Sequence, residues 1–302
     1  SLTAHGSIVS GMPMNTFEVF KTRVRQSVEL RLEEILSAQD ETETCRAAKY
    51  GVLGGGHRWR AMVSIAAGSI FDREAMTICM SLACGVEMAH GASLILDDLP
   101  SMDDADYRRG KPSAHMVYPA WAVHLAPMYL INTAYRAVLD NQSVTPERRL
   151  AGAIEMSKAA LLMIEGQEID LSQPESDDGQ SMMLDCYRRK SGALYASAAR
   201  VGATFCGADE DDRTAVYEAC MNLGLSYQYL DDVADVEAGL GEVGKLPGND
   251  IGKRTAIHFF GVRDTKIQAR RYQEIALSCL DRFGPEAEIL RNLARHASWS
   301  PI

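Results

Sequence analysis

The chain has 302 residues, of which 46% are hydrophobic and 24% charged, proportions that argue against a disordered, collagen-like or coiled-coil protein. Its 41 acidic residues exceed its 31 lysines and arginines and give a formal net charge of −10. A nucleic-acid partner is therefore not expected, because such proteins carry a basic face. The most apolar run, 121–131, contains a histidine and a proline and is too short to span a membrane.

Seven cysteines are scattered along the sequence without Cys-x-x-Cys spacing. This favours core residues in a reducing compartment over a disulfide framework or zinc site, and predicts a cytoplasmic protein. No layout typical of a signal peptide is visible in residues 1–11. We expect residues 1–14 to be a flexible or vector-derived N-terminus and residues 15–302 to form one domain, since no linker or fixed repeat divides them.

Apolar residues recur at three- and four-residue spacing along most of the chain, which predicts an all-α helical bundle. The clearest runs are 17–36, 74–98, 147–171, 181–205, 211–236 and 264–281. Thr145 followed by Pro146 is typical of a helix start, and Gly166, Gly207 and Gly284 indicate helix ends. Evidence for strands is poor, because alternating apolar and polar runs are short.

The first acidic cluster directly follows an apolar run with the pattern of a buried helix. It comprises Asp97, Asp98, Asp103 and Asp104. Burying unpaired carboxylates costs several kcal/mol each, so this arrangement requires a counter-charge.

A second acidic cluster, Asp231, Asp232 and Asp235, also ends an apolar run. Asp231 and Asp235 are four residues apart and share one helix face, and no basic residue follows until Lys245. Oxygen ligands without His or Cys favour Mg²⁺, Mn²⁺ or Ca²⁺ over zinc, and Mg²⁺ is usually held by one or two carboxylates plus substrate phosphates. The two clusters predict Mg²⁺ bridging to a diphosphate. The alternative for either cluster alone is a solvated acidic face or a helix cap.

Basic residues gather in four segments that suit a phosphate ligand. These segments are the glycine-rich turn 54–60, 107–111, 188–192, and Lys245 with 253–254. A glycine-rich turn at a helix start offers backbone N–H groups, and the Arg guanidinium matches phosphate oxygens. Each segment alone could be ordinary surface charge. Together with the acidic clusters they predict an anion bound partly through metal and partly through cations.

At this level of detail the sequence resembles the trans-polyprenyl diphosphate synthase family. The first cluster resembles the longer form of that family's first motif, Asp-Asp-x4-Asp, followed by Arg108, Arg109 and Gly110. The second resembles Asp-Asp-x-x-Asp, preceded by Gln228. Further matches over residues 45–262 are Gly166-Gln167 with Asp170, Lys190-Ser191-Gly192-Ala193-Leu194, Gly244-Lys245 and Gly252-Lys253. The combination is most similar to bacterial geranylgeranyl diphosphate synthases.

The resemblance implies an all-α, single-domain bundle around a deep cavity, usually a homodimer, which condenses isopentenyl diphosphate head-to-tail with an allylic diphosphate. It implies three Mg²⁺ ions (Mn²⁺ is an alternative) bound with the diphosphate by Asp97, Asp98, Asp103, Asp231 and Asp235, with Asp232 in support. The implied partners of the allylic diphosphate are Arg108, Lys190, Gln228 and Lys245. The implied partners of isopentenyl diphosphate are His57, Arg60, His90 and Arg109. Arg58, Gln167 and Ser191 are implied to bind substrate as well.

The implied chemistry needs no protein nucleophile, which agrees with the lack of a convincing Ser/His/Asp or Cys/His arrangement. Metal ions and cations stabilise the departing diphosphate, the isopentenyl double bond attacks the allylic cation, and a proton is lost to the diphosphate. One position departs from the family pattern. His57 stands where the family has Lys, and imidazole is mostly neutral near pH 7, so affinity for isopentenyl diphosphate is expected to be reduced.

Two small residues, Ala92 and Ser93, precede the first acidic cluster. In the family, large aromatic residues there stop chain growth early, so the small ones predict an open channel and a twenty-carbon product. A floor at Leu161, Leu162 or Met163 is the alternative.

Three other functions remain open from the sequence. A farnesyl diphosphate synthase would share the mechanism and make a shorter product. A class I terpene cyclase also ionises an allylic diphosphate, but usually has a single Asp-rich motif and no isopentenyl site. A non-catalytic regulatory subunit would generally lose part of an aspartate motif, and this chain keeps both.

Overall fold

The computed structural model describes residues 14–38, 40–241 and 252–296. Its longer helices are α1 (Met14–Ser37), α2 (Glu43–Leu53), α3 (Trp59–Ser69), α5 (Met80–Asp97), α7 (Ala120–Leu139), α8 (Pro146–Ser172), α9 (Gly179–Tyr187), α10 (Ala193–Phe205), α11 (Glu210–Gly241), α12 (Ala256–Cys279) and α13 (Glu288–His296). The short elements are α4 (Ala75–Ile78), α6 (Ala114–Val117), the π-helix η1 (Arg188–Gly192), the 3₁₀-helix η2 (Pro285–Ala287) and the strands β1 (Tyr107–Arg108) and β2 (Lys111–Pro112). The predicted all-α class is confirmed.

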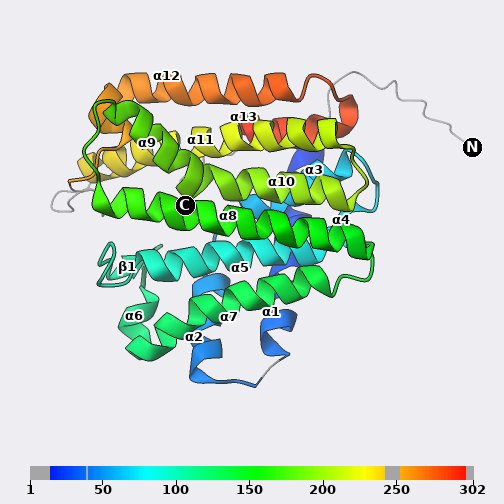
Figure 1. The fold of residues 1–302 in the computed structure, drawn as a ribbon, viewed down its shortest axis with the longest axis horizontal. Coiled ribbons are helices and arrows are strands. Elements are labelled where there is room, and N and C mark those ends of the chain that lie inside the picture. Colours follow the sequence, from blue (N-terminus) through cyan, green and yellow to red (C-terminus); the bar gives the residue numbers. More distant parts are fainter. Residues whose placement is uncertain (1–13, 39, 242–251, 297–302) are drawn as a thin grey trace, which may run out of the picture.

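The long helices run across the view in Figure 1, from α12 at the top to α7 near the bottom. Helix α10 packs against α3, α8 and α11, while α5 packs on α7 and α12 packs on α11. The buried positions of α10 are rich in alanine and glycine, which lets its neighbours approach closely. This dense centre holds the ends of α3, α5, α8 and α11 in fixed relative positions.

Most predicted helix boundaries agree with the structure. Thr145 caps α8 by accepting the Arg148 backbone N–H at 3.4 Å, with Pro146 at the first helical position. The prediction of a helix end at Gly166 was wrong, because Gly166 lies inside α8. A Cβ there would lie 2.5 Å from the backbone nitrogen of Lys190, so this glycine permits close packing of η1 on α8.

The predicted run 181–205 is split by the π-helix η1, and the run 74–98 is split between α4 and α5. A π-helix is rare and is frequently found at functional sites. Here it carries two residues of the predicted site, Lys190 and Ser191.

A two-stranded hairpin was not anticipated from the sequence. Strands β1 and β2 pair antiparallel, with Arg108 opposite Lys111. The two connecting residues, Arg109 and Gly110, have φ values of 50° and 73°, and positive φ at both central positions is what a two-residue hairpin turn requires. Strands of two residues are too short to show an alternating pattern of apolar and polar residues. The turn is therefore the one feature of the sequence that indicates this hairpin.

All seven cysteines are free, and six of them are buried, as expected for core residues. The cytoplasmic location stays a prediction, as does the domain boundary at residue 14; residues 1–13 lie outside the described part of the chain. Within the described helices, none has the length and apolarity that crossing a membrane requires.

Candidate active site

A cavity of about 1100 Å³ opens between α3, α5, α8, α10, α11 and the segment that follows α5. It collects most of the residues singled out in the sequence, although they come from distant parts of the chain. Those that line it are His57, Arg58, Arg60, His90, Ser93, Asp97, Asp103, Arg108, Arg109, Gln167, Lys190, Ser191, Gln228, Asp231 and Asp235. Ala92, Asp98 and Asp232 do not line it, and Lys245 lies outside the described residues.

The glycine-rich turn before α3 brings the chain close to the hairpin. Gly55 and Gly56 have φ values of 109° and 117°, a region that other residues rarely adopt. A Cβ on Gly56 would lie 3.2 Å from the guanidinium nitrogens of Arg109. The glycines therefore allow Arg109 to lie against the turn, where it donates to the carbonyl of Gly55 at 3.0 Å.

Arg58 is an anchor of this turn. Its left-handed backbone (φ 61°) directs the side chain inward, where Nε donates to Glu29 at 2.6 Å and Nη2 to the Val52 carbonyl at 2.6 Å. Nη1 donates to Glu87 at 3.3 Å, and Glu87 also accepts the Ala61 backbone N–H at 2.9 Å. With each of its three guanidinium nitrogens donating to the protein and only 4% of its surface exposed, Arg58 ties the turn to α1 and α5.

The three aspartates of the first motif have different surroundings. Asp97 ends α5, and helical periodicity places it on the same face as Ser93 and His90, which also line the cavity. Desolvation raises the pKa of Asp97 to about 6, an effect that nearby Lys190 partly opposes. Asp98 is buried and accepts two hydrogen bonds from Arg108, at 2.7 and 2.8 Å. Both of its oxygens are thus engaged.

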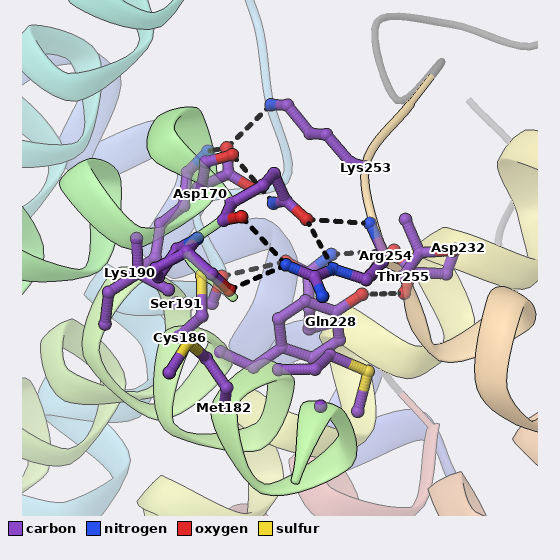
Figure 2. Close-up of a pocket in the computed structure, with 16 residues that line it drawn as sticks. Asp170, Met182, Cys186, Lys190, Ser191, Gln228, Asp232, Lys253, Arg254 and Thr255 are labelled. Atoms are coloured by element: carbon purple, nitrogen blue, oxygen red, sulfur yellow. Dashed lines mark hydrogen bonds and ion pairs between the residues drawn. The ribbon is translucent and has the colours of Figure 1, made fainter. Parts of the chain in front are cut away.

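Asp103 joins a chain of alternating charges around Asp170. Lys253 Nζ donates to Asp103 Oδ1 at 2.8 Å and to Asp170 Oδ2 at 2.6 Å. Lys190 Nζ donates to the same oxygen of Asp170 at 2.7 Å and lies 3.9 Å from Asp97 Oδ2. Figure 2 shows Asp170 with the two lysines. Although burial opposes it, the two lysines lower the pKa of Asp170. One carboxylate on α8 therefore holds both ammonium groups beside the first motif.

The segment that carries Lys253 is fixed by its neighbour. Arg254 donates to the backbone carbonyls of Gln173 and Pro174, each at 2.8 Å, and its backbone N–H donates to the Gln173 side chain at 3.0 Å. In Figure 2 Lys253 and Lys190 approach Asp170 from different segments of the chain. The family resemblance includes Asp170 and Lys253 but assigned no role to either residue. Their spacing in the sequence does not indicate that the two side chains are in contact.

The second motif lies within α11. Asp231 and Asp235 line the cavity, and desolvation raises the pKa of Asp231 to about 6, with Arg60 opposing. Asp232 is buried and accepts hydrogen bonds from the Tyr187 hydroxyl, from Gln228 Nε2 at 3.0 Å and from the Ala256 backbone N–H at 3.3 Å. Its contacts connect α11 to α9 and to the start of α12.

Two arginines of the cavity have no acidic partner among the described residues. The Arg60 guanidinium lies 4.4 Å from the ring centroid of Tyr195, and its buried Nε makes no hydrogen bond. Arg109 donates only to a carbonyl. Burial and the surrounding arginines lower the pKa values of His57 and His90, so both imidazoles are neutral at pH 7. The cavity thus offers cations without counter-ions, an arrangement that suits an anionic ligand.

The donor set fits Mg²⁺ bound together with a phosphate ligand. In the described ranges no three metal-ligating side chains are close enough to hold an ion by themselves. Mg²⁺ is usually bound by one or two carboxylates plus substrate phosphates and waters, which is what paired aspartates on two walls of one cavity provide. The raised pKa values of Asp97 and Asp231 show that their charges lack full compensation, which a divalent cation would supply.

Comparisons with known proteins agree with this geometry. A family profile described as polyprenyl synthetase matches residues 41–281. The chain is 35% identical over 266 residues to geranylgeranyl pyrophosphate synthase 10, mitochondrial, of Arabidopsis thaliana, covering 84% of this chain and 76% of the relative. It is 33% identical over 303 residues to a probable farnesyl diphosphate synthase of Sinorhizobium fredii, covering 93% and 87%.

The chain belongs to the polyprenyl synthetase family. A crystal structure of an FPP/GFPP synthase from Zymomonas mobilis, without ligand, matches its fold with a TM-score of 0.81 at 27% identity, covering 93% of this chain and 98% of that one. The protein is thus a trans-prenyltransferase with the isoprenoid synthase fold. Relatives with both product names occur, so family membership does not fix the length of the product.

Proposed function

We propose that this trans-prenyltransferase condenses isopentenyl diphosphate with dimethylallyl, geranyl and farnesyl diphosphates to make all-trans geranylgeranyl diphosphate. The observation that carries the proposal is the convergence of both aspartate motifs and the unpaired Arg60 and Arg109 on one cavity of about 1100 Å³. A site for one diphosphate would not need two separate groups of cations. The alternative, farnesyl diphosphate, differs only in where growth stops.

In this proposal Asp97 and Asp103 on one wall, and Asp231 and Asp235 on the other, hold Mg²⁺ with the allylic diphosphate. Asp98 has a different role from the one expected, because Arg108 engages both of its oxygens, and we assign it to orienting Arg108. Asp232 orients Gln228 in the same way. Bound metal would neutralise the diphosphate and make it a better leaving group.

The remaining cations divide between the two substrates. Arg108, Lys190 and Lys253 lie beside the aspartates and face the allylic diphosphate, with Gln167, Ser191 and Gln228 as hydrogen-bonding groups. Arg60, Arg109, His57 and His90 surround the other diphosphate. Lys245 keeps its predicted role at the allylic diphosphate, outside the described residues. We assign Arg58 to supporting the turn, because each of its three guanidinium nitrogens already donates to the protein.

Apolar side chains line the rest of the cavity and exclude water from the reacting carbons. They include Leu94, Leu96, Met163, Leu194 and Val233. Low local dielectric strengthens the attraction between the cations and the departing diphosphate. The isopentenyl double bond then attacks the allylic carbon, and the proton released from the isopentenyl unit goes to the diphosphate.

Product length depends in this proposal on Ser93, which lines the cavity one helical turn before Asp97. Ala92 is buried and does not line it, and of the alternative floor residues Met163 does while Leu161 and Leu162 do not. A small residue at Ser93 leaves space for the growing chain. We expect Ser93→Tyr to shorten the product to fifteen carbons and Ala92→Ser, as a buried control, to leave it unchanged.

The test is an incubation of the protein with Mg²⁺, isopentenyl diphosphate and each of the three allylic diphosphates. Diphosphate release and the mass of the product are measured. A twenty-carbon product that EDTA abolishes is expected. A fifteen-carbon product would favour the farnesyl alternative, a cyclic hydrocarbon would indicate a cyclase, and no product with any primer would contradict the catalytic function and favour a regulatory subunit.

The same proposal includes a homodimer. Exposed apolar residues follow helical spacing along α7, at Trp121, Leu125 and Met128, and the adjacent α8 exposes Leu150, Ile154, Leu161 and Ile164. Exposed apolar residues at helical spacing on two packed helices suit a self-complementary interface. Light scattering should give twice the chain mass. Leu125→Glu with Leu161→Glu should halve it, whereas Leu30→Glu on α1, also exposed, should not.

A further inference from the structure

A second cavity, of about 370 Å³, lies between α2, α5 and the β1–β2 hairpin, and we call it the hairpin cavity. Leu94, Arg108 and Arg109 line both this cavity and the one described above, so one layer of side chains separates the two. Its volume is in the range of small-molecule binding sites. The proposed function places neither substrate in it.

The hairpin cavity is strongly basic. Five cations line it, Arg46, Lys49, Arg108, Arg109 and Lys111. Its single lining carboxylate, Asp98, is already neutralised by the two hydrogen bonds from Arg108. In a chain with a net charge of −10, such a concentration of positive charge is a local feature that attracts anions.

Several of these cations retain capacity for a ligand. Lys111 is exposed and has no ion-pair partner in the part of the chain that the structure describes. Lys49 lies 4.0 Å from Glu41, a weak contact, and Arg46 pairs with Glu43 at 2.5 Å. Burial together with Arg108 and Arg58 lowers the pKa of Arg109, which reflects a guanidinium among like charges. An anion between the hairpin and α2 would relieve this repulsion.

The lining of the hairpin cavity also has an apolar part. Tyr50, Leu53 and Ile95 contribute to it, and the ring of Tyr118 packs edge-on to Tyr50 at a centroid distance of 5.5 Å. The Tyr50 hydroxyl donates to the Pro112 carbonyl at 2.5 Å, which joins α2 to the hairpin. A site lined by both cations and apolar side chains matches an anionic head group attached to an apolar chain. A bare phosphate would leave the apolar part of the lining unused.

We propose that the hairpin cavity is a second binding site, separate from the catalytic one, for an amphiphilic phosphate ester of the isoprenoid diphosphate class. This choice of class rests on the proposed function, which supplies such molecules as substrates and products. The head group contacts Lys49, Lys111 and Arg109, and the chain lies on Tyr50, Leu53 and Tyr118. Because Arg109 also serves the catalytic cavity, occupation of the hairpin cavity withdraws it and slows turnover.

Calorimetric titration of the full chain in EDTA tests the site, with farnesyl diphosphate and inorganic diphosphate as separate probes. Wild-type protein and the Lys49→Glu/Lys111→Glu variant are compared, neither residue being part of the catalytic machinery. The affinity of the hairpin cavity for farnesyl diphosphate should be about tenfold or more lower in the variant, so that one class of sites disappears from the titration. Inorganic diphosphate should bind wild type about tenfold more weakly than farnesyl diphosphate, because it lacks the apolar part.

The matched control is Arg263→Glu/Arg270→Glu, which makes the same charge change at exposed positions on α12. With Mg²⁺ and both substrates, the Lys49/Lys111 variant should keep its basal kcat and KM and lose inhibition by excess farnesyl diphosphate. Unchanged isotherms, equal loss in the control, or equal affinity for the two probes would each overturn the proposal, as would loss of condensation. Absence of condensation by wild type would instead contradict the proposed function, since the titration does not depend on turnover.

Discussion

The two aspartate motifs have similar sequences, yet the charged groups that surround their carboxylates differ. In the first, Asp98 pairs with Arg108, Asp103 pairs with Lys253, and Asp97 lies near Lys190. In the second, no ion pair is formed by Asp231 within the described residues, while Asp232 accepts hydrogen bonds from the Tyr187 hydroxyl and from Gln228. Each aspartate of the first motif thus has a cation beside it, whereas Asp231 of the second has none within hydrogen-bond distance among the described residues.

This difference follows from where each motif lies. The first follows the end of α5, where an irregular segment and the hairpin bring Arg108 back onto Asp98. The second lies inside α11, where side chains project in fixed directions and Asp232 accepts hydrogen bonds from Gln228 of the same helix and from Tyr187 of α9. Equal sequence patterns therefore need not mean equal affinity for a cation. We expect nearby cations to hold Asp97 and Asp103, the proposed metal ligands of the first motif, in place before substrate binds. The metal site at Asp231 is expected to be completed by diphosphate.

The largest effect is expected from Asp231→Asn. It removes a proposed metal ligand that has no ion-pair partner among the described residues, so kcat should fall by roughly 100- to 1,000-fold, in the range seen when one group stabilising developing charge is lost. The thermal midpoint should stay level or rise, because an uncompensated charge is removed. Asp211→Asn, exposed at the start of the same helix, is the control. A lower midpoint with normal kcat would mean that Asp231 is structural.

Asp170→Asn should have the next largest effect. Neutralising this side chain releases Lys190 and Lys253 from a common anchor, and outer partners of this kind typically cost 10- to 100-fold in activity or metal affinity. Half-saturation by Mg²⁺ and kcat are measured, and Asp170→Glu should restore part of the loss. Asp185→Asn, which breaks a surface pair with Arg189, serves as control. An equal loss in both variants would argue against the positioning role.

Asp98→Asn should affect one substrate selectively. Arg108 then loses its partner, and KM for the allylic diphosphate should rise about tenfold, the worth of roughly 1.4 kcal/mol, while KM for isopentenyl diphosphate changes little. Urea denaturation should show a loss of about 1 to 2 kcal/mol, reduced by the partial exposure of Arg108. Asp104→Asn is the exposed control in the same segment. If kcat fell as in Asp231→Asn, Asp98 would be a metal ligand after all.

Much of the site was predictable from the sequence. Most of its residues are charged side chains or histidines, and many lie at the end or along one face of a helix that apolar periodicity predicts. His90, Ser93 and Asp97 illustrate this, since their spacing alone places them on one side of α5. The fold class followed from the same periodicity. The convergence of both motifs on one cavity was an implication of the family resemblance, and the packing of α10 against α3, α8 and α11 is what brings their walls together.

The direction of individual side chains was not predictable. Arg58 points into the protein because of a left-handed backbone that no spacing rule reveals in a non-glycine residue. Asp98 differs from Asp97 by one position and faces Arg108, which the hairpin supplies. Lys253 reaches Asp103 from a segment 150 residues away, so the pair depends on tertiary packing alone. Sequence patterns identify the chemical groups, and the fold decides which of them meet.

The smallest effect on activity is expected from a substitution of His57. It tests whether the cavity needs a further cation to bind isopentenyl diphosphate. Burial, with Arg25, Arg109 and Lys21 nearby, lowers the pKa of His57, so it is neutral at pH 7 and contributes no charge to the cavity. His57→Lys places a cation there, as in the family pattern. KM for isopentenyl diphosphate should then fall about three- to tenfold, the range of one added charge contact, with kcat unchanged. His258→Lys, exposed on α12, should alter neither constant. An unchanged or higher KM in His57→Lys would show that Arg60 and Arg109 already supply the positive charge that this diphosphate requires.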